Sequence, residues 1–243
     1  LLPAHAGADV APGAVARLLG ASGIGGDAER ARALYVRALV AENVPDDDDG
    51  LALAIRTTFA PATLRERWIR QLARSLDPET LAAAENFYGS VPGTDLSTRL
   101  RRVRAALDEA DRAAQAPGLA GNASARALAA AVGGDAREAA LFRVAGAAAA
   151  WTADLVAGET SAGNPGPWLE ADAGGAPVRV DEALAWSDAA PVYLEGLADF
   201  AVTDAGRRFH RACADALASA LEEELRARSA TLVRAAARRL EAR

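Results

Sequence analysis

The chain has 243 residues with 27 basic and 33 acidic side chains, and its net charge of -6 argues against a general electrostatic affinity for nucleic acid or anionic membranes. This length suffices for one domain with a continuous core, and the single cysteine, Cys213, excludes an internal disulfide. Apolar residues make up 51% of the chain but aromatic residues only 5%, because alanine supplies much of the excess. This composition predicts closely approaching helices and an all-α fold.

The first six residues resemble the end of a secretory signal peptide. Leu1 and Leu2 precede Ala4-His5-Ala6, which is a small-x-small cleavage pattern. We therefore expect a periplasmic protein in which residues 1–6 are removed, together with His5. Residues 7–243 would then form a single helical domain.

Four amphipathic helices are predicted before residue 77, at 12–20, 27–43, 51–59 and 61–76. The apolar face expected on the second consists of Leu34, Val36, Leu39 and Val40. The fourth carries a stripe at steps of four residues, formed by Leu64, Trp68, Leu72 and Leu76.

An acidic turn, Asp46 to Asp49, separates the second and third helices. Four carboxylates in a row are compatible with weak calcium binding. An EF-hand register ending at Gly50 would place Pro45 and Arg56 at ligand positions, which excludes that loop. A solvated acidic turn is the preferred interpretation.

Asp77-Pro78 is a typical helix start, because aspartate accepts a hydrogen bond at the N-cap and proline loses no donor at the first position. This helix is expected to end at Tyr88 or Gly89. Ser90 is then expected to cap another helix, which fades near Pro117.

The central part, about 123–180, is predicted to hold helices at 125–132 and 135–156, followed by a long irregular segment rich in glycine and proline from Gly158 to Val180. The most apolar stretch, Val144 to Ala157, is short, so we expect no transmembrane segment.

A short pattern occurs twice in one register, with residues 113 positions apart. The matched pairs are Pro78 and Pro191, Leu81 and Leu194, Phe87 and Phe200, Ser90 and Thr203, and Gly93 and Gly206. The pattern predicts two related helix-turn-helix units, at about 61–117 and 188–243. Each turn has an aromatic residue at the end of one helix, then a capping hydroxyl and a glycine in the first turn of the next. We expect the glycine to let Phe87 or Phe200 pack against a bare helix backbone.

This aromatic, Ser/Thr, x-x-Gly pattern resembles the signature of a bacterial exported family known as domain-of-unknown-function family 2059. The resemblance spans about 64–107 and 191–225. It implies a secreted or periplasmic helical protein that carries the unit twice, and it brings no catalytic residues. The chain departs from the family pattern at Val91-Pro92, where proline often follows the serine directly, and at Asp204-Ala205, which has no proline.

His210 and Cys213 lie three residues apart on the last predicted helix, so they are compatible with a thiolate and base or with two metal ligands. The repeat places them at the positions of Ser97 and Leu100. We therefore interpret Cys213 as a core residue with the histidine beside it, and we predict no catalytic, metal or cofactor site.

Glu85 and Asp199 lie close to the aromatic residue of each copy and are compatible with the carboxylates of a cell-wall hydrolase. Nothing in the sequence supplies the apolar pocket that a general acid needs, so helix-surface acids are preferred.

The final helix is rich in arginine and is a candidate membrane or partner surface, although glutamates are interleaved. The arginines are Arg226, Arg228, Arg234, Arg238, Arg239 and Arg243.

Three tryptophans in or near the central segment, Trp151, Trp168 and Trp186, mark the expected place for a pocket. The function predicted from these observations is a non-catalytic interaction or structural module of the cell envelope, with an unknown protein partner. Two alternatives stay open: a small-ligand or lipid-binding protein with an apolar cavity between the repeat units, and a carboxylate-dependent cell-wall hydrolase.

Overall fold

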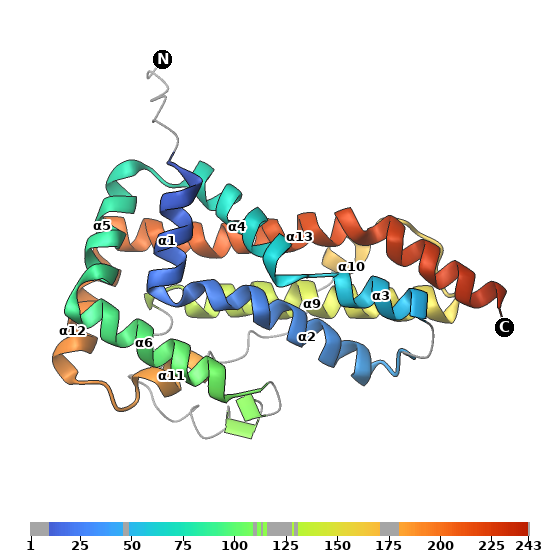
Figure 1. Cartoon of the computed structure of the whole chain (residues 1–243), viewed down its shortest axis with the longest axis horizontal. Coiled ribbons are helices and arrows are strands. Elements are labelled where there is room, and N and C mark those ends of the chain that lie inside the picture. The colour runs from blue at the N-terminus through green and yellow to red at the C-terminus, as the bar shows by residue number, and fades with distance from the viewer. Residues whose placement is uncertain are drawn as a thin grey trace, which may run out of the picture. The chain divides into compact units, whose positions relative to one another are not determined.

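The computed structural model describes residues 10–45, 49–108, 111–112, 114–115, 128, 131–170 and 180–242. Within these residues every regular element is helical and no strand occurs (Figure 1). The prediction of an all-α fold is therefore confirmed. The expected cleavage segment 1–6 and Asp46 to Asp48 of the acidic turn lie outside the described residues.

The predicted helices that fall on described residues occur in the expected order, and most of the helix predicted at 125–132 lies outside these residues. Those up to the first repeat turn are α1 (Pro12–Ser22), the 3-10 turn η1 (Ile24–Gly26), α2 (Asp27–Ala41), α3 (Asp49–Thr57), α4 (Pro61–Ser75) and α5 (Pro78–Gly89). Those after it are α6 (Val91–Ala106), α9 (Gly134–Ala157), α10 (Gly166–Glu170), α11 (Val180–Trp186), α12 (Pro191–Val202) and α13 (Asp204–Glu241).

Two boundaries differ from the sequence expectation. The helix that begins after Ser90 ends at Ala106 instead of near Pro117, because Leu107 takes an extended backbone conformation. The segment from Gly158 to Val180, which was expected to be irregular, contains the short helix α10 around Trp168.

The start of α5 shows how the sequence sets a boundary. The Asp77 side chain accepts hydrogen bonds from the backbone nitrogen and the hydroxyl of Thr80, both at 2.7 Å, and Pro78 occupies the first turn. These hydrogen bonds to the charged form hold the pKa of Asp77 below its usual value. The predicted N-cap is confirmed.

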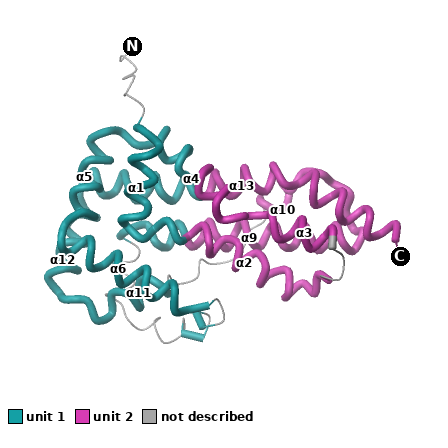
Figure 2. The backbone as a smooth tube through the Cα atoms, viewed as in Figure 1, with its two compact units in different colours: residues 1–26, 68–137, 177–217 teal, residues 27–67, 138–176, 218–243 magenta. Residues whose placement is uncertain are grey.

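The chain divides into two compact units (Figure 2). Unit 1 comprises residues 1–26, 68–137 and 177–217, and unit 2 comprises residues 27–67, 138–176 and 218–243. Each unit is assembled from three separate parts of the chain. Both copies of the repeat turn, 87–93 and 200–206, lie in unit 1.

Unit 1 has a core between α6, α11 and α12. The buried residues of this core are Leu96, Leu100, Val132, Ala185, Trp186, Ala189, Leu197 and Ala201. On another face of α6, Arg101 donates to the backbone oxygens of Gly20 and Ala21, and Arg104 donates to that of Gly23. These arginines satisfy carbonyl groups at the end of α1 that have no partner within the helix.

Unit 2 is held by an aromatic contact and by buried polar pairs. The rings of Tyr35 and Phe59 meet edge to face at 5.4 Å, and the Tyr35 hydroxyl is 3.1 Å from that of Thr152. Arg30 donates to both carboxylate oxygens of Glu138, at 2.5 and 2.7 Å. Buried alanines along α9 leave room for neighbouring helices, and they are Ala140, Ala145, Ala148 and Ala149.

Only half of the residues predicted for the apolar face of α2 are buried. Leu34 and Leu39 are buried, but Val36 and Val40 are exposed. The buried stripe runs through Ala28, Ala31, Tyr35 and Leu39, at the three- and four-residue steps of one helix face. Small alanines, which were not part of the predicted face, therefore belong to the buried face of this helix. The stripe predicted on α4 is buried throughout, from Leu64 to Leu76.

α9 is the one described helix that is long and apolar enough to cross a membrane by length and composition. Of its most apolar 18-residue window, 56% is buried inside the structure. The stretch noted in the sequence, Val144 to Ala157, is thus part of a longer helix of 24 residues.

Candidate functional site

The two repeat turns share one hydrogen-bond arrangement. At the α5–α6 turn the Ser90 hydroxyl donates to the Phe87 backbone oxygen at 2.6 Å and accepts from the Gly93 backbone nitrogen at 3.3 Å. At the α12–α13 turn the Thr203 hydroxyl donates to Phe200 at 2.7 Å and accepts from Gly206 at 2.9 Å. The predicted capping role of both hydroxyls is confirmed, and each one also ties the new helix to the end of the old.

The glycines are required by a close backbone approach. A Cβ atom at Gly93 or Gly206 would lie well inside 3.0 Å of the backbone oxygen of Phe87 or Phe200. We expected the aromatic ring to need this space, but the group that occupies it is the aromatic residue's carbonyl. No side chain larger than hydrogen fits there without moving the backbone.

The aromatic rings join the two turns. Phe87 and Phe200 stack with their centroids 4.6 Å apart and their planes within 4° of parallel. Tyr88 meets Phe200 edge to face at 6.1 Å, and Phe209 lies beside Tyr88 at 5.8 Å. The two matching phenylalanines thus face each other inside unit 1, where Figure 1 shows the α5–α6 and α12–α13 junctions at the same end.

His210 is enclosed by this aromatic cluster. Its ring packs edge to face against Tyr88, Phe200 and Phe209, and neither ring nitrogen has a hydrogen-bond partner among the described residues. Burial, reinforced by the nearby Arg137 charge, lowers the pKa of His210 to about 3. The imidazole is therefore neutral at physiological pH.

Cys213 lies one helical turn after His210 and is fully buried. Its backbone oxygen accepts the indole N–H of Trp68 at 3.1 Å. Because the His210 ring makes no hydrogen bond to it, the two side chains do not form an activated thiol–imidazole pair.

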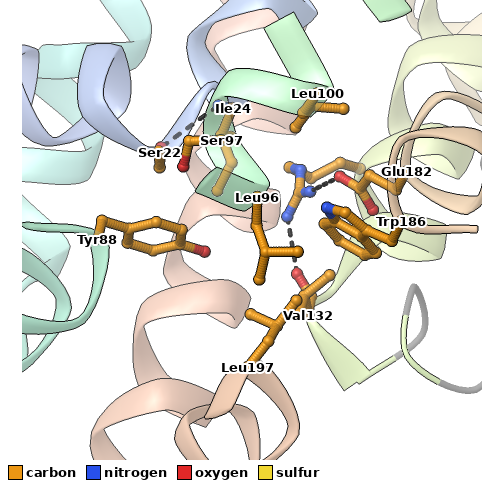
Figure 3. A pocket seen from close by; sticks show the side chains of 11 residues that line it. Ser22, Ile24, Tyr88, Leu96, Ser97, Leu100, Val132, Glu182, Trp186 and Leu197 are labelled. Carbon is orange, nitrogen blue, oxygen red and sulfur yellow. Dashed lines mark hydrogen bonds and ion pairs between the residues drawn. The ribbon is translucent and has the colours of Figure 1, made fainter. Parts of the chain in front are cut away.

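A small cavity lies beside the turns in unit 1 (Figure 3). Its volume, counted as the space open to the centre of a water molecule, is about 10 Å³. Its polar lining includes Ser97 and Trp186, which are buried and whose Oγ and Nε1 atoms have no hydrogen-bond partner among the described residues. The apolar part of the lining consists of Ile24, Leu96, Leu100, Val132 and Leu197.

A buried ion pair forms one wall of this cavity. The Arg137 guanidinium donates to the Glu182 carboxylate at 2.5 Å and to the Val132 backbone oxygen at 2.9 Å. Both charged side chains are almost completely excluded from solvent. Tyr88, which belongs to the first repeat turn, closes the opposite side in Figure 3, and burial raises its pKa.

The predicted tryptophan set is divided between the units. Trp186 lines the cavity of unit 1, whereas Trp151 and Trp168 belong to unit 2. There the Trp151 indole donates to the backbone oxygen of Ala162 at 3.1 Å, and that of Trp168 donates to the Asp154 carboxylate at 2.9 Å. These two residues anchor the segment after α9.

The other charged candidates differ in exposure. Glu85 on α5 and Asp199 on α12 are exposed, so neither occupies the apolar pocket that a general acid needs. On α13, Arg226 pairs with Glu222 and Arg228 with Glu224. Arg239 is buried, and Arg243 lies outside the described residues.

The apolar stripe of the C-terminal part of α13 is buried in unit 2, including Leu225, Leu232 and Ala236. Leu240, near the end of the helix, is exposed, but the buried residues before it do not form an exposed strip for a partner. Across the described part of the chain, no group of three or more His, Cys, Asp or Glu side chains is placed to hold a metal ion.

Sequence reasoning missed the cavity, although one signal pointed to it. Ser97 and His210 occupy the same repeat position, and both are buried polar residues without a hydrogen-bond partner among the described side chains. A glycine with positive φ packs on the backbone oxygen of each, Gly23 on Ser97 and Gly133 on His210. The parallel between the copies thus extends beyond the turns themselves.

No known family model, curated protein or solved structure matched this chain. The resemblance to domain-of-unknown-function family 2059 accordingly stays a prediction.

Proposed function

We propose that this chain is a non-catalytic interaction module that binds a protein partner through the surface around its paired turns. Three exposed valines carry the proposal. Val91, Val192 and Val202 are 70%, 62% and 63% exposed, and they lie at the first turn of α6 and at the two ends of α12. Exposed aliphatic residues that gather on one surface are typical of binding sites, whereas single ones, such as Val40 on α2, are common on any protein.

The backbone beneath these valines is held in place. Gly196 on α12 lies over Pro92 of α6, where an added methyl group would sit at a normal contact distance of 3.8 Å from the proline ring. Val192 is one helical turn before Gly196, and Val91 directly precedes Pro92, so the two exposed valines lie near this crossing. A preorganised surface loses little conformational entropy when it binds.

Exposed acids surround the paired turns. Glu85 and Glu195 are exposed on α5 and α12, and Asp199 lies between Val192 and Val202 in the sequence. An apolar centre with a charged rim is the usual organisation of a protein interface. The rim also holds exposed Arg207, which donates to the Val202 backbone oxygen and pairs with Asp204. The partner favoured by this arrangement has an apolar patch with charges of both signs around it.

The cellular setting is the periplasm in this proposal. Its support is the Ala4-His5-Ala6 pattern together with the family resemblance of the turns. We take α9 to be a core helix, because more than half of its apolar window is buried. A lipid-binding role is not favoured by the described cavity, since pockets for drug-sized ligands usually exceed about 300 Å³.

Site-specific photo-crosslinking in the periplasm tests the proposal. A photoreactive residue is placed at Val91 or Val202, with matched controls at exposed Thr98 and Arg102 on α6. We expect the same discrete protein adduct from both turn positions, its absence from both controls, and its loss in the Val192→Asp variant. No adduct, or the same adducts from the control positions, would overturn the proposal.

A further inference from the structure

We propose that protonation of His210 releases α12 from the paired turns, so that acid separates the exposed valines of α12 from Val91 on α6. The device consists of an imidazole enclosed by aromatic rings and of one enclosing helix that is weakly held. Its effect on binding rests on the proposed function, whereas the opening itself does not. It adds regulation to a surface that the two turns preorganise.

The surroundings of His210 suit only the neutral ring. The residue is 2% exposed, and neither ring nitrogen has a hydrogen-bond partner among the described residues. An imidazolium needs acceptors for two N–H groups, but the neighbours of this ring are the edges and faces of Tyr88, Phe200 and Phe209. A proton on His210 therefore requires the ring to reach water.

The charges around His210 also oppose its protonation. The groups that face it are Tyr88 of α5, Arg137 at the start of α9, and Cys213 one helical turn further along α13. Glu182 of α11 is engaged by Arg137 at 2.5 Å, and the Asp199 carboxylate of α12 is exposed. None of these described groups places a carboxylate against the ring. Burial and the positive charge of Arg137 together hold the pKa of His210 at about 3.

Phe200 connects the histidine to both turns. Its ring lies 5.7 Å from that of His210 at an angle of 70°, and it also stacks on Phe87 at 4.6 Å. Val202 follows Phe200 by two residues, and Val91 follows Phe87 by four. A displacement of the Phe200 ring from a charged imidazole therefore breaks the stack and moves Val202 relative to Val91.

α12 is held less firmly than α5. The first turn of α5 is capped by the Asp77 side chain, and Arg208 of α13 donates to the Thr80 hydroxyl in the same turn at 3.0 Å. α12 begins after Ala190, which makes no side-chain cap hydrogen bond, and Gly196 in its middle is a poor helix former. We therefore assign the movement to α12.

Hydrogen exchange followed by mass spectrometry on the full chain tests the opening without any partner. Protection factors, corrected for the intrinsic effect of pH, are compared at pH 6.5 and 4.5 for α12, α5 and α2. A histidine pKa of about 3 in the closed state and about 6.5 in the open state limits the increase in the opening constant to about 50-fold. We expect an increase of at least about tenfold in α12 and none in α5 or α2.

The matched variants are His210→Leu and His210→Gln, because neither new side chain titrates. Both should keep the protection of α12 at pH 4.5. No increase in α12 of the unmodified chain, an equal increase in α5 or α2, or the same increase in a folded variant would overturn the proposal. If neither variant folds, the comparison of α12 with α5 and α2 in the unmodified chain decides.

The effect on binding is measured separately. Photo-crosslinking from Val202 is carried out in a periplasmic extract at neutral pH and at pH 4.5. We expect the protein adduct to be lost at pH 4.5 in the unmodified chain and kept in His210→Leu. No adduct at either pH contradicts the proposed function alone, since the exchange result stands without a partner. An adduct of equal yield at both pH values, with α12 open at pH 4.5, contradicts the regulation.

Discussion

The two repeat turns of unit 1 are nearly the same in their first residues and different one helical turn later. Both have a hydroxyl that bridges the old helix and the new one, a glycine against a backbone oxygen, and a phenylalanine in the shared stack. At the matching buried position four residues after each glycine, however, Ser97 lines a cavity while His210 is packed among aromatic rings.

This contrast shows which residues the geometry of the turn requires and which residues depend on the packing around it. The hydrogen bonds and the glycine are constrained by backbone geometry, which is the same in both copies. The position of Ser97 and His210 is constrained only by the space beside it, so a small hydroxyl residue and an imidazole both occur. The turn is therefore a structural device, and the chemical differences between the copies begin after it.

Substitution of either turn glycine should give the largest effect. Alanine normally stabilises a helix by up to about 1 kcal/mol relative to glycine. At Gly93 or Gly206 its methyl group would overlap a backbone oxygen, which no side-chain rotation relieves. We expect Gly93→Ala and Gly206→Ala each to lower the free energy of unfolding by about 4 kcal/mol, beyond the usual range for overpacking.

Gly89 provides the matched control for urea unfolding followed by circular dichroism. It lies in the same turn, but an added Cβ meets nothing within 4 Å. Gly89→Ala should be neutral or slightly stabilising. Equal effects of Gly89→Ala and Gly93→Ala would show that the close approach does not constrain the turn.

The pH dependence of stability should distinguish the two copies at the position shared by Ser97 and His210, because only the histidine titrates in this range. The folded chain keeps His210 neutral down to a pKa of about 3, whereas the unfolded chain binds a proton below about 6.5. The contribution of the buried, neutral His210 to the free energy of unfolding is therefore fully present above pH 6.5 and is lost as the pH falls towards 3. Between pH 6.5 and 4.5 we expect a loss of about 2 kcal/mol in the free energy of unfolding.

The matched variants for this titration are His210→Leu and Ser97→Ala. His210→Leu should remove this part of the pH dependence, and Ser97→Ala should leave it intact, because serine does not titrate in this range. The comparison uses the slope of stability against pH, so a constant destabilisation by either substitution does not obscure it. An unchanged slope in His210→Leu would mean that the imidazole is not buried in its neutral form.

Much of the fold was predictable because local signals were strong. Asp77, Pro78 and Ser90 mark helix ends by backbone chemistry alone, and the α4 stripe follows from spacing. The α2 face was less predictable, since Ala28 and Ala31 lie in the core while the larger Val36 and Val40 are exposed. Side-chain size there depends on how closely neighbouring helices approach, which the local pattern does not contain.

The candidate site was predictable only in part. The repeat identified the turn residues and placed Cys213 at a core position, where the structure shows it buried. The cavity depends on Ser97, Arg137 and Trp186, which come from separate parts of the chain and have no shared motif. Their meeting is a consequence of tertiary packing, so the repeat register could mark Ser97 but could not indicate Arg137 or Trp186.

The central claim is that the two turns are matched parts that pack against each other, and a double-mutant cycle between Phe87 and Phe200 tests it most directly. Free energies of unfolding are measured for the unmodified chain, Phe87→Leu, Phe200→Leu and the double variant. Rings stacked at 4.6 Å predict a coupling energy of about 1 kcal/mol, so that the double variant loses less stability than the two single variants combined. Strictly additive losses would contradict the pairing of the turns.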